Sequence, residues 1–134
     1  MLKDKLEKYS QNENFSILIV EDEVMVLQPM EKIMKYLSKR VMTANDGFKG
    51  WELYQKNPFS LVVTDLQMPN MSGSELVRNI KTLNPNQVII VITAFREGFE
   101  VEEAKKNGAD FILEKPFSLA TFLEVLDEVY SLDQ

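Results

Sequence analysis

Short runs of apolar residues alternate along the chain with longer stretches in which apolar residues recur every three or four positions. The short runs predict β-strands, and the longer stretches predict amphipathic helices. From Ser16 onward, strands are expected near residues 16–20, 41–44, 60–64, 88–92 and 110–113. Helices are expected near residues 24–38, 46–56, 73–83, 97–106 and 118–131. Strands that alternate with helices are typical of a parallel sheet covered by helices on both faces.

Pairs of turn-forming residues separate the predicted elements. They are Asp46-Gly47, Asn57-Pro58, Ser72-Gly73, Asn84-Pro85 and Asn107-Gly108. Such pairs are typical of turns and helix ends. Pro29, unlike these pairs, does not lie between predicted elements. It falls within the first predicted helix, where proline is disfavoured. The start of that helix is therefore left open.

Residues 1–14 form a polar leader ahead of this alternation, and residues 15–131 form the predicted domain. Leu2, Leu6 and Tyr9 follow a helical spacing, so the leader can form a short amphipathic helix. Such a helix would serve as a packing arm or as a dimer contact. Because short isolated helices are only marginally stable, the sequence alone favours a frayed leader.

Composition limits the chemistry that the chain can perform. With 134 residues, 45% of them hydrophobic, it can bury one sizeable core. The net charge of −6 argues against nucleic acid or an anionic membrane as the main partner. The absence of cysteine and histidine excludes disulfides, thiolate sites, imidazole bases and Ser-His triads within this chain. No segment has the apolar length of a membrane span, and we expect a cytoplasmic protein.

Polar side chains follow four of the predicted strands at the point where each strand ends. Asp65 closes an apolar run, and Glu21 and Asp22 follow another. Thr93 and Lys115 stand at the ends of two more. In open parallel sheets, ligands bind at the carboxyl ends of the strands. These ends therefore predict one pocket that holds three acids, a hydroxyl and a lysine.

Each of these residues also has an ordinary structural interpretation. A single acid after a strand is more often a helix cap, and a single lysine is more often a solvated surface residue. Together, however, the side chains complement one another. Three clustered carboxylates repel unless a cation joins them, and a hard divalent metal prefers oxygen ligands. Lys115 supplies a further positive charge.

The motifs, taken together, resemble the receiver domain of two-component response regulators. The similarity runs from about Phe15 to Tyr130. It rests on motifs in the family's order: Glu21-Asp22, Thr64-Asp65-Leu66-Gln67-Met68-Pro69 with Met71-Ser72-Gly73, Thr93-Ala94, and Lys115-Pro116-Phe117. The resemblance implies a flavodoxin-like, doubly wound (βα)5 sandwich whose parallel sheet has the strand order 2-1-3-4-5.

The resemblance also implies roles in phosphoryl transfer. Asp65 would be the phosphoacceptor, forming an acyl phosphate. Mg²⁺ would be held by Asp65, by Asp22 directly, by Glu21 through water, and by the backbone carbonyl of Gln67. Such a domain is a phosphoacceptor that uses a donor in trans, and it is not a turnover enzyme.

Further roles fall on the ends of the last two strands. Thr93 would hydrogen-bond a phosphoryl oxygen, Lys115 would neutralise charge, and the small Ala94 would leave the entrance open. Because this chain has no histidine, the phosphohistidine donor must belong to another protein. That protein would be a sensor histidine kinase or a histidine phosphotransfer protein. No output domain is visible, so the downstream partner is left open.

One position departs from the family pattern. The family usually carries an aromatic residue three positions before the lysine, and here that position is Ile112. Phe111 precedes it, but successive strand residues face opposite sides, so Phe111 cannot substitute. We therefore expect the switch to run through the loop from Ala94 and Phe95 to Gly98 and the start of the next helix, rather than through the side chain at position 112.

Two alternatives stay open at this point. A degenerate receiver would act only as a protein-binding module, although the complete set of acids, threonine and lysine speaks against it. A phosphatase of the haloacid-dehalogenase type would also use a carboxylate nucleophile. Those enzymes place a second aspartate two residues after the nucleophile, and this chain has Gln67 there.

Overall fold

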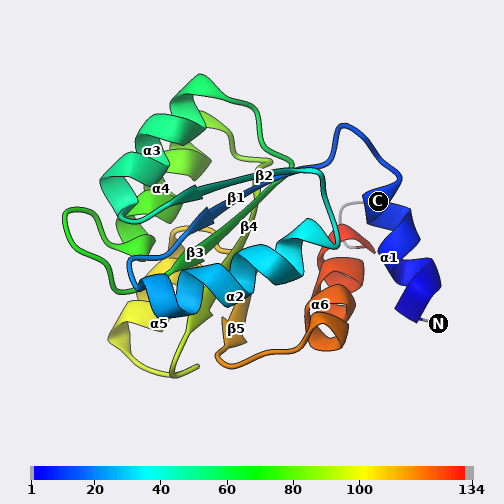
Figure 1. Cartoon of the computed structure of the whole chain (residues 1–134). Helices are drawn as coiled ribbons and strands as arrows, with labels where there is room; N and C mark the ends of the chain where they lie inside the picture. The colour runs from blue at the N-terminus through cyan, green and yellow to red at the C-terminus, as the bar shows by residue number, and fades with distance from the viewer. Residues whose placement is uncertain (1, 132–134) are drawn as a thin grey trace.

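Five parallel strands form a single sheet in the order β2-β1-β3-β4-β5 in the computed structural model, which describes residues 2–131 (Figure 1). The strands are β1 (Ser16–Val20), β2 (Arg40–Ala44), β3 (Leu61–Asp65), β4 (Val88–Thr93) and β5 (Phe111–Glu114). The helices are α1 (Leu2–Ser10), α2 (Val24–Lys35), α3 (Gly47–Lys56), α4 (Gly73–Leu83), α5 (Phe99–Lys106) and α6 (Leu119–Ser131). The order confirms the predicted doubly wound, flavodoxin-like class.

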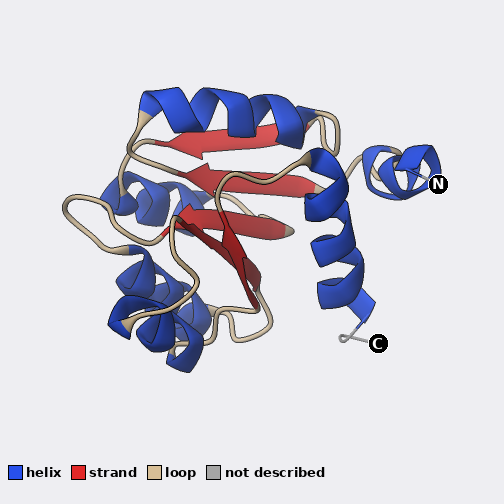
Figure 2. Ribbon diagram, turned by 90° about the horizontal axis from the view of Figure 1, so that it is seen from below, coloured by secondary structure: helices blue, strands red, loops and turns tan. Residues whose placement is uncertain are grey.

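The core is divided between the two faces of the sheet by the alternation of strand residues. In β1, Ile17 and Ile19 pack with α2 and α6, whereas Leu18 and Val20 pack with α3 and α4. Every residue of β3 and β4 is buried, as expected for central strands covered on both sides. Figure 2 shows the arrowheads of the strands directed toward one end of the sheet, so their carboxyl ends gather there.

All of the strands and helices predicted from Ser16 onward are present, with boundaries shifted by at most a few residues. The largest shift is in α2, which begins at Val24, keeps Pro29 inside it and ends at Lys35. Pro29 has no N–H to donate within the helix, and the same helix buries Met30 and Met34 against the core. Helix α5 starts at Phe99, later than expected, because Gly98 precedes it with a φ of 129°.

The leader forms α1, and this helix packs against α6. Tyr9 is buried, its hydroxyl donates to an Asp127 carboxylate oxygen at 2.9 Å, and its ring lies 5.3 Å from that of Phe15. The structure supports the packing arm, and the frayed leader that the sequence alone favoured is wrong, because α1 is packed through Tyr9 against α6. Within the described residues, no helix has both the length and the apolar character needed to cross a membrane.

Candidate functional site

Three carboxylates meet at the carboxyl end of the sheet. Strands β1 and β3 are neighbours in the sheet, so Glu21 and Asp22, which follow β1, lie beside Asp65 at the end of β3. One carboxylate oxygen from each of the three lies within 4.8 Å of the others. Glu21 and Asp65 are buried, and Asp22 is half-buried. The structure thus brings together the acids that the strand ends predicted.

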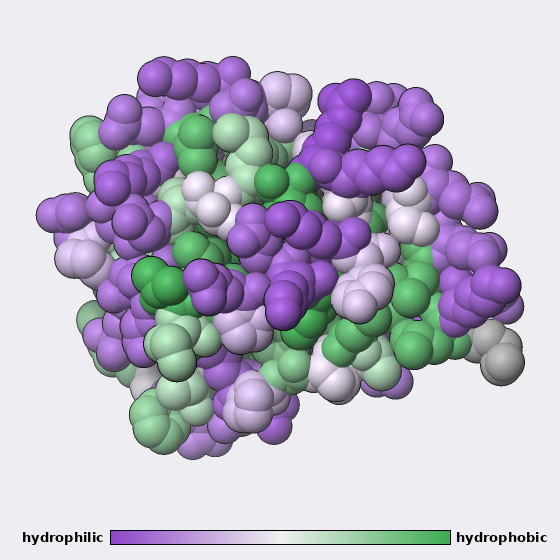
Figure 3. All heavy atoms as spheres, in the orientation of Figure 1, coloured by the Kyte–Doolittle hydropathy of each residue, from purple (hydrophilic) through white to green (hydrophobic). Residues whose placement is uncertain are grey.

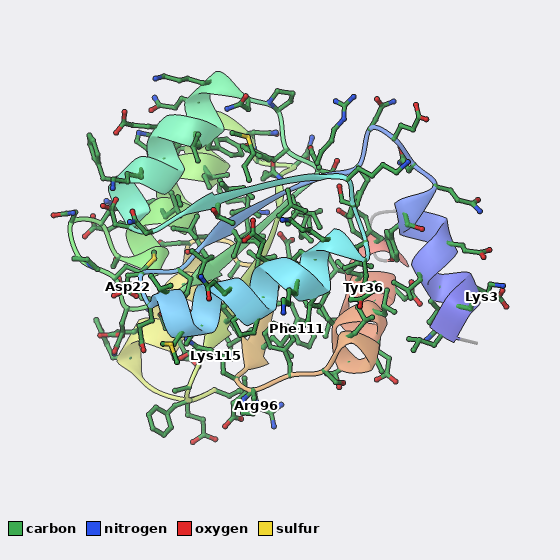
Figure 4. The ribbon with its side chains drawn as sticks, in the orientation of Figure 1. Lys3, Asp22, Tyr36, Arg96, Phe111 and Lys115 are labelled. Atoms are coloured by element: carbon green, nitrogen blue, oxygen red, sulfur yellow. The ribbon has the colours of Figure 1, made fainter. Side chains whose placement is uncertain are left out.

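Lys115 joins this cluster from the loop after β5. Its Nζ lies 3.0 Å from Oε1 of Glu21 and 3.4 Å from Oδ1 of Asp65. Its backbone N–H donates to the carbonyl oxygen of Thr93 at 2.8 Å, which holds the loop against β4. Figure 4 labels Asp22 and Lys115, which come from different strand ends on the same side of the molecule.

Burial and neighbouring groups together set the pKa values of Glu21 and Lys115. Burial raises the pKa of Glu21 from 4.5 to about 7, and the charge of Asp65 adds to this, although the hydrogen bond from Lys115 works against it. Burial would lower the pKa of Lys115, but its hydrogen bond with Glu21 and the charge of Asp65 outweigh that effect and raise it. The Lys115 ammonium group contacts two of the three clustered acids, so the cluster has one cation for three carboxyl groups and favours a further cation.

The residues present fit a hard divalent ion. Oδ1 of Asp22 is buried and is the one side-chain polar atom, among the described residues, that is buried without a hydrogen-bond partner. Buried polar atoms are normally satisfied, so this oxygen marks a position for a ligand. An all-oxygen set that offers few protein ligands suits Mg²⁺, which keeps several waters. The fit supports the predicted metal ligands Glu21, Asp22 and Asp65.

The segment after β3 fixes the position of Asp65. The backbone N–H of Leu66 donates to Oδ1 of Asp65 at 2.8 Å, and that of Gly73 donates to the carbonyl oxygen of Leu66 at 2.8 Å. A Cβ at Gly73 would lie 2.0 Å from the backbone oxygen of Asp65, so only glycine allows α4 to start this close to the strand end. The pattern alone indicated only a helix start there.

The hydroxyl residue Thr93 is the last residue of β4, and the access residues Ala94 and Phe95 follow it. Ile92 pairs with Asp65 across the β3–β4 ladder, and Thr93 follows it at the same edge. Thr93 is buried, and its hydroxyl oxygen accepts a hydrogen bond from the N–H of Phe95 at 3.3 Å. Ala94 is exposed, and 74% of Phe95 is exposed. This loop is open to solvent beside a buried hydroxyl.

Gln67 makes a contact that the sequence did not reveal. Its side-chain Nε2 donates to Oε2 of Glu100 at 2.8 Å, which links the loop after β3 to the first turn of α5. The role of its backbone carbonyl as a metal ligand stays a prediction. Such a contact depends on a tertiary approach between two loops, and no local sequence signal announces it.

Phe111 and Ile112 face opposite sides of the sheet. Phe111 packs against the core on the α2 and α6 side, whereas Ile112 packs against the core on the α3, α4 and α5 side. Both are half-buried. Phe111 therefore does not take the place of an aromatic ring at position 112, in agreement with the strand alternation.

Comparison with known proteins identifies the family. The family model described as "Response regulator receiver domain" matches residues 17–127. The chain is 32% identical over 126 residues to chemotaxis protein CheY-3 of Vibrio cholerae, an alignment that covers 89% of this chain and 94% of that protein. It is also 31% identical over 116 residues to the transcriptional regulatory protein ZraR of Klebsiella oxytoca, of which only 26% is covered.

Solved structures give the same result. The Vibrio cholerae chemotaxis protein CheY4 superimposes with a TM-score of 0.79 and 28% identity, covering 86% of this chain and 98% of that chain. The CheX-CheY-BeF3-Mg complex from Borrelia burgdorferi superimposes with a TM-score of 0.79 and 27% identity. The match covers 87% of this chain and 89% of that chain. The fold, the strand-end motifs and these matches agree, and the chain belongs to the response regulator receiver domain family.

Proposed function

We propose that this chain is a working phosphoacceptor of a two-component system, which takes a phosphoryl group onto Asp65 with the help of Mg²⁺. The observation that carries the proposal is the meeting of Asp65 with Glu21, Asp22 and Lys115 at one strand edge. A domain that only binds proteins would have no need to bury an unpaired carboxylate oxygen beside two other acids. The complete cluster therefore favours chemistry over binding alone.

The proposed transfer uses an Asp65 carboxylate oxygen as nucleophile. The bond from this oxygen to phosphorus forms while the bond from phosphorus to the donor histidine nitrogen breaks, and the electron pair leaves with the imidazole. Lys115 Nζ, 3.4 Å from Oδ1 of Asp65, would offset negative charge on the phosphoryl oxygens. Phosphoryl transfer depends mainly on positioning and charge neutralisation, which this set of residues supplies.

Asp22 and Glu21 would hold Mg²⁺, which supplies charge neutralisation for the phosphoryl group when bound. Thr93 would donate its hydroxyl proton to a phosphoryl oxygen. Among the described residues, its oxygen accepts from the N–H of Phe95 and its hydroxyl has no acceptor, so the proton is available for donation. In the two-component system, a phosphohistidine donor would belong to another protein, a histidine kinase or a phosphotransfer protein, since this chain contains no histidine.

Replacement of the nucleophile tests the proposal. Asp65→Asn should abolish phosphorylation by acetyl phosphate and Mg²⁺, because an amide is nearly isosteric with the carboxylate but far less nucleophilic. Phosphate-affinity gels and acid-labile phosphate measure the product, and circular dichroism checks the fold. Asp4→Asn, the same change at an exposed residue of α1, is the matched control. Wild-type phosphate incorporation in Asp65→Asn would contradict the assignment.

A further inference from the structure

Strand β2 is an open edge of the sheet. It pairs only with β1 among the described residues, and all of its residues pair in continuous register without a bulge. The carbonyl oxygen of Ala44 accepts from the N–H of Glu21 at 3.0 Å, so the backbone groups of Ala44 face β1. In a parallel strand, alternate residues turn their backbone groups to opposite sides. Val41 and Thr43 therefore direct their N–H and C=O groups outward.

The opposite edge of the sheet is better protected. Strand β5 has 4 residues, an ion pair of 3.1 Å joins its Glu114 to Arg96, and Pro116 follows shortly after. Short strands, charged side chains and prolines are the usual means by which proteins blunt a sheet edge. Strand β2 has 5 residues and no proline. It is the edge that offers a template for another strand.

A groove of about 550 Å³ runs beside the carboxyl-terminal half of β2. Val24 and Leu27 of α2 line one wall, and Lys49, Leu53 and Lys56 of α3 line the other. Figure 3 shows hydrophobic groups, in green, exposed between hydrophilic groups, in purple, over the region where Figure 1 places β2. Because α2 and α3 cover opposite faces of the sheet, an added strand would point its side chains alternately toward the two walls.

The two walls differ in charge. The α2 wall is apolar, whereas Lys49 and Lys56 lie two turns apart on α3, both exposed and without an ion pair among the described residues. Arg40, at the start of β2, is a third exposed cation without an ion pair in the described part of the chain. Glu52 is the acid on this wall. The groove is thus lined by two cations and one acid, and Arg40 adds a further cation at the other end of β2, in a chain whose net charge is −6.

We propose that the β2 edge binds an extended acidic segment of another protein by strand addition. The segment would hydrogen-bond to the outward groups of Val41 and Thr43. Its apolar side chains would face Val24 and Leu27, and its carboxylates would face Lys49 and Lys56. A second copy of this chain fits poorly, because pairing two such edges brings their cations together.

The probe for this proposal is a short labelled peptide in which valine alternates with glutamate. We expect its addition to shift the amide NMR signals of Val41 and Thr43 most strongly, and we expect binding to weaken with salt. The double variant Lys49→Glu/Lys56→Glu should bind about tenfold more weakly. The same peptide with lysine in place of glutamate should not bind.

A proline substitution tests the strand addition itself. Thr43→Pro removes one outward N–H and leaves the ladder to β1 intact, whereas Thr43→Val keeps the N–H and is the matched control. We expect only the proline variant to lose the peptide. Equal binding of the lysine peptide, equal binding by both Thr43 variants, or shifts confined to other surfaces would each overturn the proposal. Phosphorylation by acetyl phosphate should persist in all variants, which separates this test from that of Asp65.

Discussion

At the scale of single residues, the three acids of the site do not share the positive charge of Lys115 equally. Lys115 contacts Glu21 and Asp65, at 3.0 Å and 3.4 Å, but the contacts of the lysine do not extend to Asp22. Within residues 2–131, Oδ1 of Asp22 is consequently buried without a hydrogen-bond partner. A buried carboxylate oxygen of this kind costs folding free energy until a cation reaches it. Asp22 is therefore the residue at which metal binding and stability are most directly linked.

This link gives a prediction for Asp22→Ala. The variant should lose the stabilisation that Mg²⁺ gives the wild type, since a ligand that binds only the folded state raises its stability by mass action. Without metal, the variant should be no less stable than the wild type, because it relieves like-charge repulsion and removes the unpaired oxygen. Thermal unfolding with Mg²⁺ and with a chelator measures both effects.

The control for this experiment is Asp4→Ala, which removes an exposed acid from α1. It should retain the full thermal shift with Mg²⁺. An identical response of wild type and Asp22→Ala to the ion would contradict the role of Asp22.

The sequence was informative about which residue types stand at strand ends, because hydrophobic runs and their terminating polar residues are local features. It could not show that Gly73 lies against the backbone of Asp65, or that Gln67 reaches Glu100. Those contacts depend on how α4, α5 and the loop after β3 pack together, and the local pattern of apolar and polar residues carries no information about that packing. The unpaired oxygen of Asp22 was hidden for the same reason, since it depends on the side chains around it.

At the scale of elements, α5 is held more firmly at its end than at its start. Asn107 donates from its side chain to Ser74 of α4, at 2.9 Å to the hydroxyl and 3.1 Å to the carbonyl oxygen. At the start, Gly98 has a φ of 129° with open space around it, and Phe99 is 80% exposed. The exposed hydrogen bond from Gln67 to Glu100 is the contact that links this first turn to the loop after β3.

We therefore predict that a phosphoryl mimic changes mainly the conformation of α5 and of the loop before it. Beryllofluoride with Mg²⁺ should perturb the amide NMR signals of residues 94–106 more than those around Ile112. If Thr93 moves toward the phosphoryl group, the loop that follows it must move as well. Ile112 is β-branched and packed against the α3, α4 and α5 side, so it cannot make the large swing of an aromatic ring.

Ile112→Ala is the companion variant. Phosphorylation by acetyl phosphate should stay within about twofold of wild type, because the side chain is absent from the carboxylate cluster. A response centred on Phe111 and Ile112, with residues 94–106 silent, would show that the signal takes the other route. Chemical-shift mapping on wild type and variant distinguishes the two outcomes.

At the scale of the whole molecule, α1 fastens the start of the chain to α6. The Asp127 carboxylate is the common partner. Its Oδ1 accepts a hydrogen bond from the Tyr9 hydroxyl at 2.9 Å. Its oxygens also lie 3.6 Å from Nζ of Lys5 and 3.7 Å from Nζ of Lys8. The family match begins only at residue 17, so this helix lies outside the shared segment. Periodicity predicted that a helix could form here, but it could not supply a partner from the other end of the chain.

This attachment gives the last prediction, for Tyr9→Phe. The change keeps the ring in contact with Phe15 but removes the hydroxyl donor to Asp127, so it should lower the free energy of unfolding by about 1 kcal/mol. Tyr36→Phe, at a residue that is 65% exposed, should change stability by less than about 0.5 kcal/mol. Urea unfolding measures both variants, and hydrogen exchange of the α1 amides reports the attachment directly. Equal stability of Tyr9→Phe and wild type, with unchanged exchange in α1, would mean that the hydroxyl contact does not hold the helix.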